Sequence, residues 1–382
     1  MRSVTQCAVL VLTVGCGAVA LAPASVPSFQ GLGALPGGDG ESWAVGVSPD
    51  GSAVVGSSSS AQAEDQAFLW TQAAGMIGLG FLPEGESFSR AHGASLYGDV
   101  VVGTSESALG TQAFVWTSAT GMFGLGDLPG GSYGSSGSGV SADGQVVVGY
   151  GSIEAGLEAF RWTDSDGMVG LGSLPGGLPH SYATAVSADG AVIVGSSKSG
   201  NGDEAFRWTA SEGMAGLGDL PEGEFVSHAR GLSADGAVIV GSGANATNDT
   251  EAFRWTDAAG MVGLGDLPGG KWYSTASDVS ADGSAVVGWS DTEFGWQAFI
   301  WDDLHGMRNL RDVLTTEFGL NLDGWTLNEA RGISADGTVI AGLGRHLDGS
   351  REGWVAVIPE PASVGLLALA ALLRGRRRPE SS

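Results

Sequence analysis

The chain of 382 residues has little of the residue types that carry most redox and metal chemistry. Its only two cysteines, Cys7 and Cys16, lie in an N-terminal leader, so the mature protein is expected to have no disulfide and no thiolate metal ligand. Its five histidines are scattered, and no His-Glu-x-x-His motif, Walker loop, Gly-x-Ser-x-Gly elbow or EF-hand loop occurs. The sequence therefore predicts no metal, no cofactor and no catalytic residue.

Basic residues are also scarce, because 17 Lys and Arg stand against 42 Asp and Glu, for a formal net charge of −25. Binding to a phosphate backbone requires clustered basic residues, so this balance argues against nucleic acid as a partner. An acidic surface of this kind is typical of a well-solvated extracellular protein.

No segment of the central part has a sustained helical period. Instead, one unit recurs seven times with a period of about 46 residues, which predicts a solenoid, a propeller or an array. Its clearest marker is a Ser-Ala-Asp-Gly turn, written Ser-Pro-Asp-Gly in the first copy and Ser-Leu-Tyr-Gly in the second. The seven turns begin at Ser48, Ser95, Ser141, Ser187, Ser233, Ser280 and Ser334.

Each unit contains four short runs rich in small, β-branched or aromatic residues, bounded by Gly, Asp, Ser or Pro, and such runs indicate strands. The Asp-Gly pair fits a tight turn between the first two runs. The second run is apolar on both faces, as in Val146-Val147-Val148, which suits a sheet packed between two neighbours. Four antiparallel strands per unit predict one propeller blade per unit.

A Phe and a Trp two residues apart lie on one face of the third predicted strand, and we expect them to form the core between blades. Trp354 and Ala356 take these places in the seventh unit. The other pairs are Phe68/Trp70, Phe114/Trp116, Phe160/Trp162, Phe206/Trp208, Phe253/Trp255 and Phe299/Trp301.

The ends of the repeat region complete each other. A Gly-Leu-Gly-x-Leu-Pro motif is interpreted as the fourth strand, with a divergent version from Met307 to Leu314 in the sixth unit. The seventh unit ends at Ile358 without this strand, and a lone copy stands at Gly31 to Pro36. Pairing of the two ends would remove the open edges of a ring. We therefore predict an all-β fold, a single seven-bladed β-propeller over residues 29–358. The intact copies of the motif begin at Gly78, Gly124, Gly170, Gly216 and Gly263.

The two termini have sorting patterns. Residues 1–24 combine Arg2, an apolar run and small residues, as in a secretory signal peptide, with cleavage expected after Ala20 or Ala24. Residues 359–382 combine a Pro-Glu-Pro motif, an apolar run too short for a stable membrane span, and an arginine cluster that suits a cytoplasmic stop. The sorting residues are Pro359, Glu360, Pro361, Arg374, Arg376, Arg377 and Arg378.

The tail resembles the PEP-CTERM sorting signal. The resemblance implies processing by an exosortase-type enzyme after export through signal peptidase, with transient membrane contact through the tail. It places the protein in the cell envelope or extracellular matrix.

The repeats, with Gln/Glu-Ala-Phe-x-Trp, Gly-Met-x-Gly-Leu-Gly-x-Leu-Pro and Ser-Ala-Asp-Gly in order, resemble the extracellular HAF-repeat family. That resemblance implies an architecture and a compartment, and no catalytic residues. Other residues replace the family's His here: Gln66, Gln112, Glu158, Glu204, Glu251 and Gln297.

The first strand of each unit reads Ser-x-Ala-x-Gly-Val-Ser, and its two x positions vary freely while the Ser and Ala barely change. This strand is expected to line the central channel, and the fourth-to-first and second-to-third connections are expected to open on one rim. A repeat scaffold keeps its packing residues alike and lets its binding face diverge; neutral drift on an idle rim is the alternative. The candidate ligand-binding residues at this mouth are Trp43, Arg90, His92, Tyr182, His228, Arg230, Trp272, Tyr273, Glu329 and Arg331.

These features favour a non-catalytic binding or structural module of the cell surface or matrix, with polysaccharide as the expected ligand because aromatic faces stack on sugar rings. The alternative is a secreted propeller enzyme of the glycoside hydrolase or lyase type that acts on extracellular polymers. An enzyme of that class typically needs two carboxylates about 5–10 Å apart. Glu224 and Glu329 are the acidic residues expected near the mouth.

Overall fold

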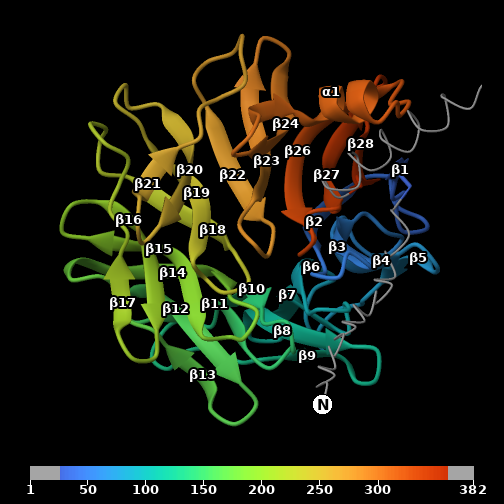
Figure 1. Ribbon diagram of the computed structural model, residues 1–382. Helices are drawn as coiled ribbons and strands as arrows, with labels where there is room; N and C mark the ends of the chain where they lie inside the picture. Colours follow the sequence, from blue (N-terminus) through green and yellow to red (C-terminus); the bar gives the residue numbers. More distant parts are fainter. Residues whose placement is uncertain (1–25, 360–382) are drawn as a thin grey trace, which may run out of the picture.

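A computed structural model describes residues 26–359, which form seven four-stranded antiparallel sheets arranged in a ring (Figure 1). The predicted seven-bladed all-β propeller is therefore confirmed. The predicted leader with Cys7 and Cys16, and the predicted sorting residues after Pro359, lie outside the described residues.

Six blades follow the chain order of their strands. The first two blades are β2 (Ser42–Val47), β3 (Ala53–Ser58), β4 (Gln66–Thr71), β5 (Gly75–Gly78), and β6 (Ser89–Ala94), β7 (Val100–Ser107), β8 (Gly110–Thr117), β9 (Gly121–Gly124). The third and fourth are β10 (Ser135–Val140), β11 (Val147–Ile153), β12 (Gly156–Thr163), β13 (Gly167–Gly170), and β14 (Gly176–Val186), β15 (Val192–Ser199), β16 (Asp203–Thr209), β17 (Gly213–Gly216). The fifth and sixth are β18 (Ser227–Leu232), β19 (Val238–Ala244), β20 (Thr250–Thr256), β21 (Gly260–Gly263), and β22 (Ser274–Val279), β23 (Ala285–Thr292), β24 (Gly295–Asp302), β25 (Gly306–Asn309).

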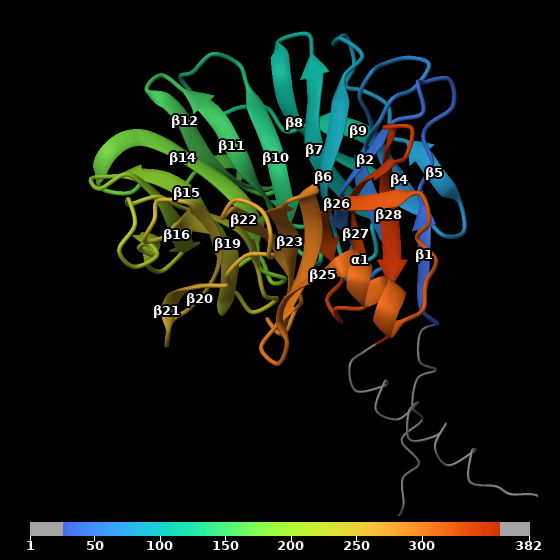
Figure 2. The same cartoon turned by 90° about the horizontal axis from the view of Figure 1, so that it is seen from above.

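The seventh blade is assembled from both ends of the repeat region. Its strands are β26 (Trp325–Ile333), β27 (Val339–His346), β28 (Arg351–Val357) and, as the outermost strand, β1 (Ser28–Gly31). Figures 1 and 2 both show blue β1 beside red β28. The antiparallel register runs from Ser28 opposite Val357 to Gly31 opposite Trp354. The predicted closure of the ring is thus present, with the strand three residues earlier than the Gly31–Pro36 copy of the motif.

The Gly-Leu-Gly-x-Leu-Pro motif does not form the fourth strand, so that prediction was wrong. Five of the fourth strands have the sequence Gly-Met-x-Gly and end at the first Gly of the motif, as β5 does at Gly78. The second Gly leaves the extended region, with φ of +79° at Gly80 and +78° at Gly172, and only glycine adopts such values without strain. The motif therefore turns the chain toward the next blade, with its first Leu buried at Leu79.

The Glu before Ala-Phe stabilises this turn through a hydrogen bond from the backbone of the turn. The Glu158 carboxylate accepts a hydrogen bond from Gly172 N at 2.9 Å, and Glu204 does the same for Gly218 N at 3.1 Å. At the ring closure, Glu352 accepts from Gly33 N at 2.7 Å. A side chain one strand inward thus satisfies the amide that the turn leaves free.

The phenylalanines lie between blades, as predicted. Each of the six is 0% exposed, and Phe160 packs against Val102, Ala113 and Val115 of the preceding blade. Trp354 takes the same place in the seventh blade and contacts Phe29 of β1. Because each blade is covered by apolar side chains on both faces, the core is a series of seven clusters around the ring.

A serine at the start of six first strands joins each blade to the one before it. Ser181 Oγ accepts from Ala159 N at 2.9 Å and donates to Gly172 O at 2.6 Å. Ser42 makes the equivalent pair across the closure, with Gly353 N at 3.0 Å and Gly33 O at 2.6 Å. The serines that make this inter-blade bridge are Ser42, Ser89, Ser135, Ser181, Ser227 and Ser274.

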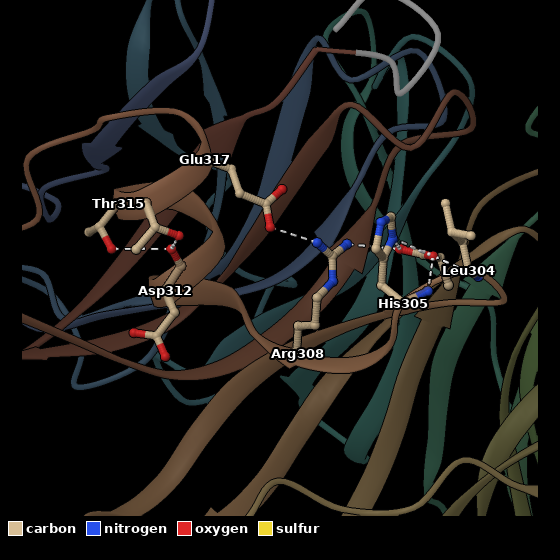
Figure 3. Close-up of polar contacts among 8 residues, drawn as sticks. Leu304, His305, Arg308, Asp312, Thr315 and Glu317 are labelled. Carbon is tan, nitrogen blue, oxygen red and sulfur yellow. Dashed lines mark hydrogen bonds and ion pairs between the residues drawn. The ribbon is translucent and has the colours of Figure 1, made fainter. Parts of the chain in front are cut away.

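The sixth blade departs from the repeat. Its fourth strand is β25 at Gly306–Asn309, and the chain then forms a short helix, α1 (Leu310–Asp312), and a π-turn, η1 (Val313–Glu317), instead of the predicted strand from Met307 to Leu314. Arg308 anchors this segment by ion pairs of 2.8 Å to both Asp302 and Glu317 (Figure 3). Leu310 and Leu314 are fully buried, so the helical turn covers the blade edge with apolar side chains.

Candidate functional site

The innermost strands enclose a cavity of about 690 Å³ on the axis of the ring. Figure 1 shows β2, β6, β10, β14, β18, β22 and β26 around its centre. The second variable position of every first strand lies on the cavity wall, which confirms that this strand lines the channel. These seven wall positions are Val45, His92, Ser138, Thr184, Arg230, Ser277 and Arg331.

Close approach of the innermost strands depends on the glycine that follows the second variable position. A Cβ at Gly46 would lie 3.0 Å from His92 O, and one at Gly231 would lie 3.0 Å from Asp278 Cα. Ala185 and Asp278 occupy this position in the fourth and sixth blades. Neighbouring first strands therefore lie close together at this glycine position.

Backbone hydrogen bonds join all seven Ser-Ala-Asp-Gly turns into a ring at one end of the cavity. Ala142 N donates to Ala188 O at 3.0 Å, and each turn donates to the next in the same sense. Pro49 has no amide hydrogen, so Asp50 N donates to Leu96 O at 3.2 Å and completes the circle. The full series is Leu96 to Ala142, Ala142 to Ala188, Ala188 to Ala234, Ala234 to Ala281, Ala281 to Ala335, Ala335 to Pro49, and Asp50 to Leu96.

Four of the ten predicted ligand-binding residues line the cavity, namely His92, Arg230, Glu329 and Arg331. The other six, Trp43, Arg90, Tyr182, His228, Trp272 and Tyr273, do not line it. Five of these six belong to the start of a first strand or to the connection before it, which places them at the opposite end from the turns.

Two of these mouth residues are held by neighbours. Arg90 pairs with Asp65 at 2.5 Å and lies over the ring of Phe88. Tyr182 bonds His180 Nε2 through its hydroxyl at 2.5 Å. Glu224 is exposed and is not on the cavity wall.

The predicted common rim is present in the structure. The connection before β22 contacts the end of β23, since Asp291 N donates to Tyr273 O at 2.8 Å. A similar contact between a fourth-to-first and a second-to-third connection joins Ser59 N to Glu41 O at 3.1 Å.

The two wall arginines differ in their pairing. Arg331 Nε donates to Glu329 Oε2 at 2.7 Å, and Glu329 is only 7% exposed. Arg230 has no hydrogen bond or ion pair within residues 26–359. Its side chain is exposed on the cavity wall; partial desolvation by the surrounding residues lowers the pKa of Arg230, and the charge of Arg331 acts in the same direction.

His92 is a neutral polar group of the wall at pH 7. Burial lowers the pKa of its imidazole, while a hydrogen bond from Nδ1 to Gly137 O at 2.8 Å opposes this shift in part. With Nδ1 as the donor, Nε2 is left as an acceptor.

Asp278 is an acidic wall residue that the sequence reasoning missed. Burial raises the pKa of its carboxyl group to about 6, although both oxygens accept backbone hydrogen bonds, from Val279 N at 2.8 Å and Ile333 N at 3.0 Å. Asp278 stands where most first strands carry glycine, and this difference between the repeats could have identified it as a candidate site residue.

Three aromatic residues of the wall were also missed: Tyr150, Trp289 and Trp296. Tyr150 and Trp289 lie on second strands, opposite the small Ser136 and Thr275 of the first strands. The corresponding second-strand position is Ser or Thr in four other blades. Aligning the second strands as well as the first would have shown these two aromatic exceptions.

The aromatic residues of the sixth blade form a continuous stack at the mouth. The rings of Tyr273 and Trp289 are 5.1 Å apart and nearly parallel, at 17°. Trp289 and Trp296 follow with 4.6 Å between centroids, and Trp296 is 50% exposed. Trp289 is the middle ring of this stack, so the ring faces left free for a ligand are the outer ones, of Trp296 and Tyr273.

Within residues 26–359 no group of three or more His, Cys, Asp or Glu side chains is placed to hold a metal ion. No helix in that range is long and apolar enough to cross a membrane.

The fold and this axial cavity define the chain as a seven-bladed β-propeller with an aromatic mouth. No family model matches it, and neither does any curated protein. Oligogalacturonate lyase from Vibrio parahaemolyticus is similar in structure, with 9% identity and a TM-score of 0.52 over 88% of this chain and 98% of the other.

Two further solved structures are similar at lower TM-scores. TolB from Acinetobacter baumannii has 12% identity and a TM-score of 0.46 over 68% of this chain, which spans 60% of the TolB chain. AofleA from Arthrobotrys oligospora has 13% identity and a TM-score of 0.42, over 75% of this chain and 90% of the other. At these identities the likeness shows the fold alone.

Proposed function

We propose that this chain is an exported β-propeller of the cell surface or extracellular matrix that binds polysaccharide without acting on it chemically. The observation that carries the proposal is the stack of Tyr273, Trp289 and Trp296 at the mouth of the axial cavity. Exposed aromatic faces beside a cavity with a few polar groups suit a ligand that is apolar on one face and polar at its edges, as a sugar ring is.

The aromatic surface has the form of a platform. Trp272 is 46% exposed and Tyr273 is 38% exposed, and they precede β22 directly. Trp296 lies at the start of β24 of the same blade. The aromatic surface is therefore formed by two segments of the sixth blade, the connection before β22 and the start of β24. A chain of sugar residues could lie across these rings while one residue enters the cavity.

The acidic groups of the wall support binding over catalysis. Within the described residues, Asp278 and Glu329 are the carboxyl groups that line the cavity. Glu329 is held by Arg331, and both oxygens of Asp278 accept backbone hydrogen bonds. The enzyme alternative requires one of them to protonate or deprotonate substrate, and it would be supported by turnover that Glu329→Gln abolishes.

The proposed localisation rests on the two terminal patterns and on the resemblance of the repeats to HAF-repeat proteins. We propose that signal peptidase removes the leader and that an exosortase-type enzyme processes the tail near Pro359. The measurement is the intact mass of the native protein. Loss of both termini supports the proposal, and mature protein with both termini present overturns it.

Binding is tested on a glycan array, followed by titration calorimetry on each glycan that is retained. Trp296→Ala, Trp43→Ala and Tyr182→Ala should each weaken binding, with Trp296→Ala weakening it at least about 10-fold because a stacking face is lost. Tyr97→Ala is the matched control, since Tyr97 is 63% exposed in a turn at the opposite end of the channel. Equal effects of Trp296→Ala and Tyr97→Ala, or no binding to any glycan, would contradict the proposal.

A further inference from the structure

The charge on the cavity wall differs from that of the rest of the protein. The whole chain has 42 acidic residues and 17 basic ones, whereas the wall carries two arginines and two acidic residues. Of these four, Arg331 and Glu329 neutralise each other at 2.7 Å, and the Asp278 oxygens are occupied by backbone amides. The charged group that remains free to meet a ligand is Arg230.

The Arg230 side chain is exposed on the wall of the cavity, and no carboxylate of residues 26–359 forms an ion pair with it. Arg230 belongs to β18 of the fifth blade, and its side chain enters the space between the walls. A guanidinium holds its charge at every relevant pH and binds a carboxylate through two parallel hydrogen bonds. The position is therefore suited to one carboxylate of a ligand.

The aromatic stack lies on the next blade around the ring. Trp289 and Trp296 line the same cavity as Arg230. Tyr273 extends the stack from Trp289, with 5.1 Å between the two ring centroids. An aromatic surface and a cation without an ion-pair partner thus line one cavity.

We propose that the axial cavity is selective for a uronate, a pyranose ring that carries a carboxylate. The ring stacks on the exposed Trp296 at the end of the aromatic stack, and the carboxylate binds the Arg230 guanidinium. This inference rests on the proposed glycan-binding function. It specifies in addition that the sugar entering the cavity is negatively charged.

The acidic outer surface does not oppose this selectivity at physiological salt. Charges on the surface are screened beyond about 8 Å at that ionic strength, whereas a contact inside the cavity is screened much less. The remaining polar groups of the wall include Ser138, Thr184 and Ser277, which can bond the hydroxyls of a sugar. The inferred ligand is thus one uronate residue of a longer chain.

The experiment compares each acidic oligosaccharide with its own neutral form. The probes are tetrasaccharides of galacturonate, of mannuronate and of alternating glucuronate and N-acetylglucosamine, together with the carboxyl-reduced form of each, titrated at 0.15 M salt. At least one uronate should bind about 10- to 100-fold more tightly than its reduced form, the range expected for a charged hydrogen-bonded pair. Arg230→Gln should abolish this difference and leave the weaker binding of the reduced form unchanged.

Two further variants separate a local effect from a general change of charge. Arg161→Gln removes one positive charge from the third strand of the third blade, outside the cavity lining, and should leave the preference intact. Glu329→Gln leaves Arg331 without its carboxylate partner and should tighten binding of the uronate but not of the reduced form. Thermal melts of all three variants establish that they are folded.

The outcomes distinguish this inference from the function on which it rests. Equal binding of uronate and reduced forms, with both weakened by Trp296→Ala, overturns the uronate selectivity and retains glycan binding. A preference for uronate that survives Arg230→Gln also overturns it. Absence of binding to every probe, acidic or neutral, overturns both.

Discussion

Ser42→Ala tests how the ring is held closed. The Ser42 hydroxyl is 0% exposed and bonds both Gly353 N of β28 and Gly33 O just after β1, so it bridges two neighbouring strands that come from opposite ends of the repeat region. Alanine leaves a buried amide and a buried carbonyl without partners, at about 1–2 kcal/mol each. We therefore expect the free energy of unfolding to fall by about 2–4 kcal/mol.

Ser181→Ala is the matched control, because Ser181 makes the same two hydrogen bonds to Ala159 of β12 and to Gly172 just after β13, two strands that are consecutive in the chain. Denaturant titration should show a similar loss for both variants. Amide exchange should separate them. In Ser42→Ala the loss of protection should concentrate in β1 and β28, since β1 is held to the seventh blade by contacts alone.

The result that would refute this reasoning is unchanged exchange of β1 in Ser42→Ala. It would mean that the register of β1 on β28, with Phe29 against Trp325 at 5.3 Å, closes the ring without the serine. An equal rise of exchange at β1 in both variants would show that the boundaries are energetically alike and that the chain break has no local effect.

Three further predictions follow from the same contacts. Phe160→Ala should lower the free energy of unfolding by about 3–5 kcal/mol, because a fully buried ring is lost between two blades; the exposed Phe123→Ala is its control, and equal losses would contradict the inter-blade core. Burial raises the pKa of Asp278 to about 6, so the folded state holds that proton more tightly than the unfolded chain, and stability falls as pH rises from about 4 to about 6; Asp278→Gly should make the profile flatter in that window by about 2 kcal/mol, and a profile unchanged by the substitution would contradict the shift. Deleting residues 26–36 removes β1 together with the buried Leu32 and Leu35 and should destabilise the fold far more than deleting residues 362–382, as measured by thermal melts; equal effects would contradict closure by β1.

Repetition made the architecture predictable from the sequence. Seven copies of a four-strand pattern set the blade number, and the complementary ends of the repeat region indicated the closed ring before any coordinates. The buried phenylalanines were predictable for the same reason, because a residue that recurs at every blade boundary must satisfy a constraint that recurs there too.

The errors concern residues whose roles depend on contacts between units. Gly-Leu-Gly-x-Leu-Pro has the composition of a strand, but its second glycine adopts a positive φ, and one sequence does not show which glycine of a run will do so. Trp289 and Tyr150 belong to the cavity because small residues stand opposite them, which only the strand register reveals. The helical turn after Asn309 arose where the sixth unit diverges from the repeat, and no pattern within that unit marked it.

The ring of hydrogen bonds among the turns has an electrostatic consequence for the cavity. Every donor points to the next blade in the same rotational sense, from Leu96 around to Asp50. A peptide dipole that lies along the circle has no component along its axis, so this ring differs from a helix terminus, where aligned dipoles point at the ligand. The side chains on the wall that can carry a full charge at pH 7 are Arg230, Arg331, Asp278 and Glu329. A substitution at position 230 or 331 therefore changes the charge that faces the axis while the closed backbone circle stays unchanged.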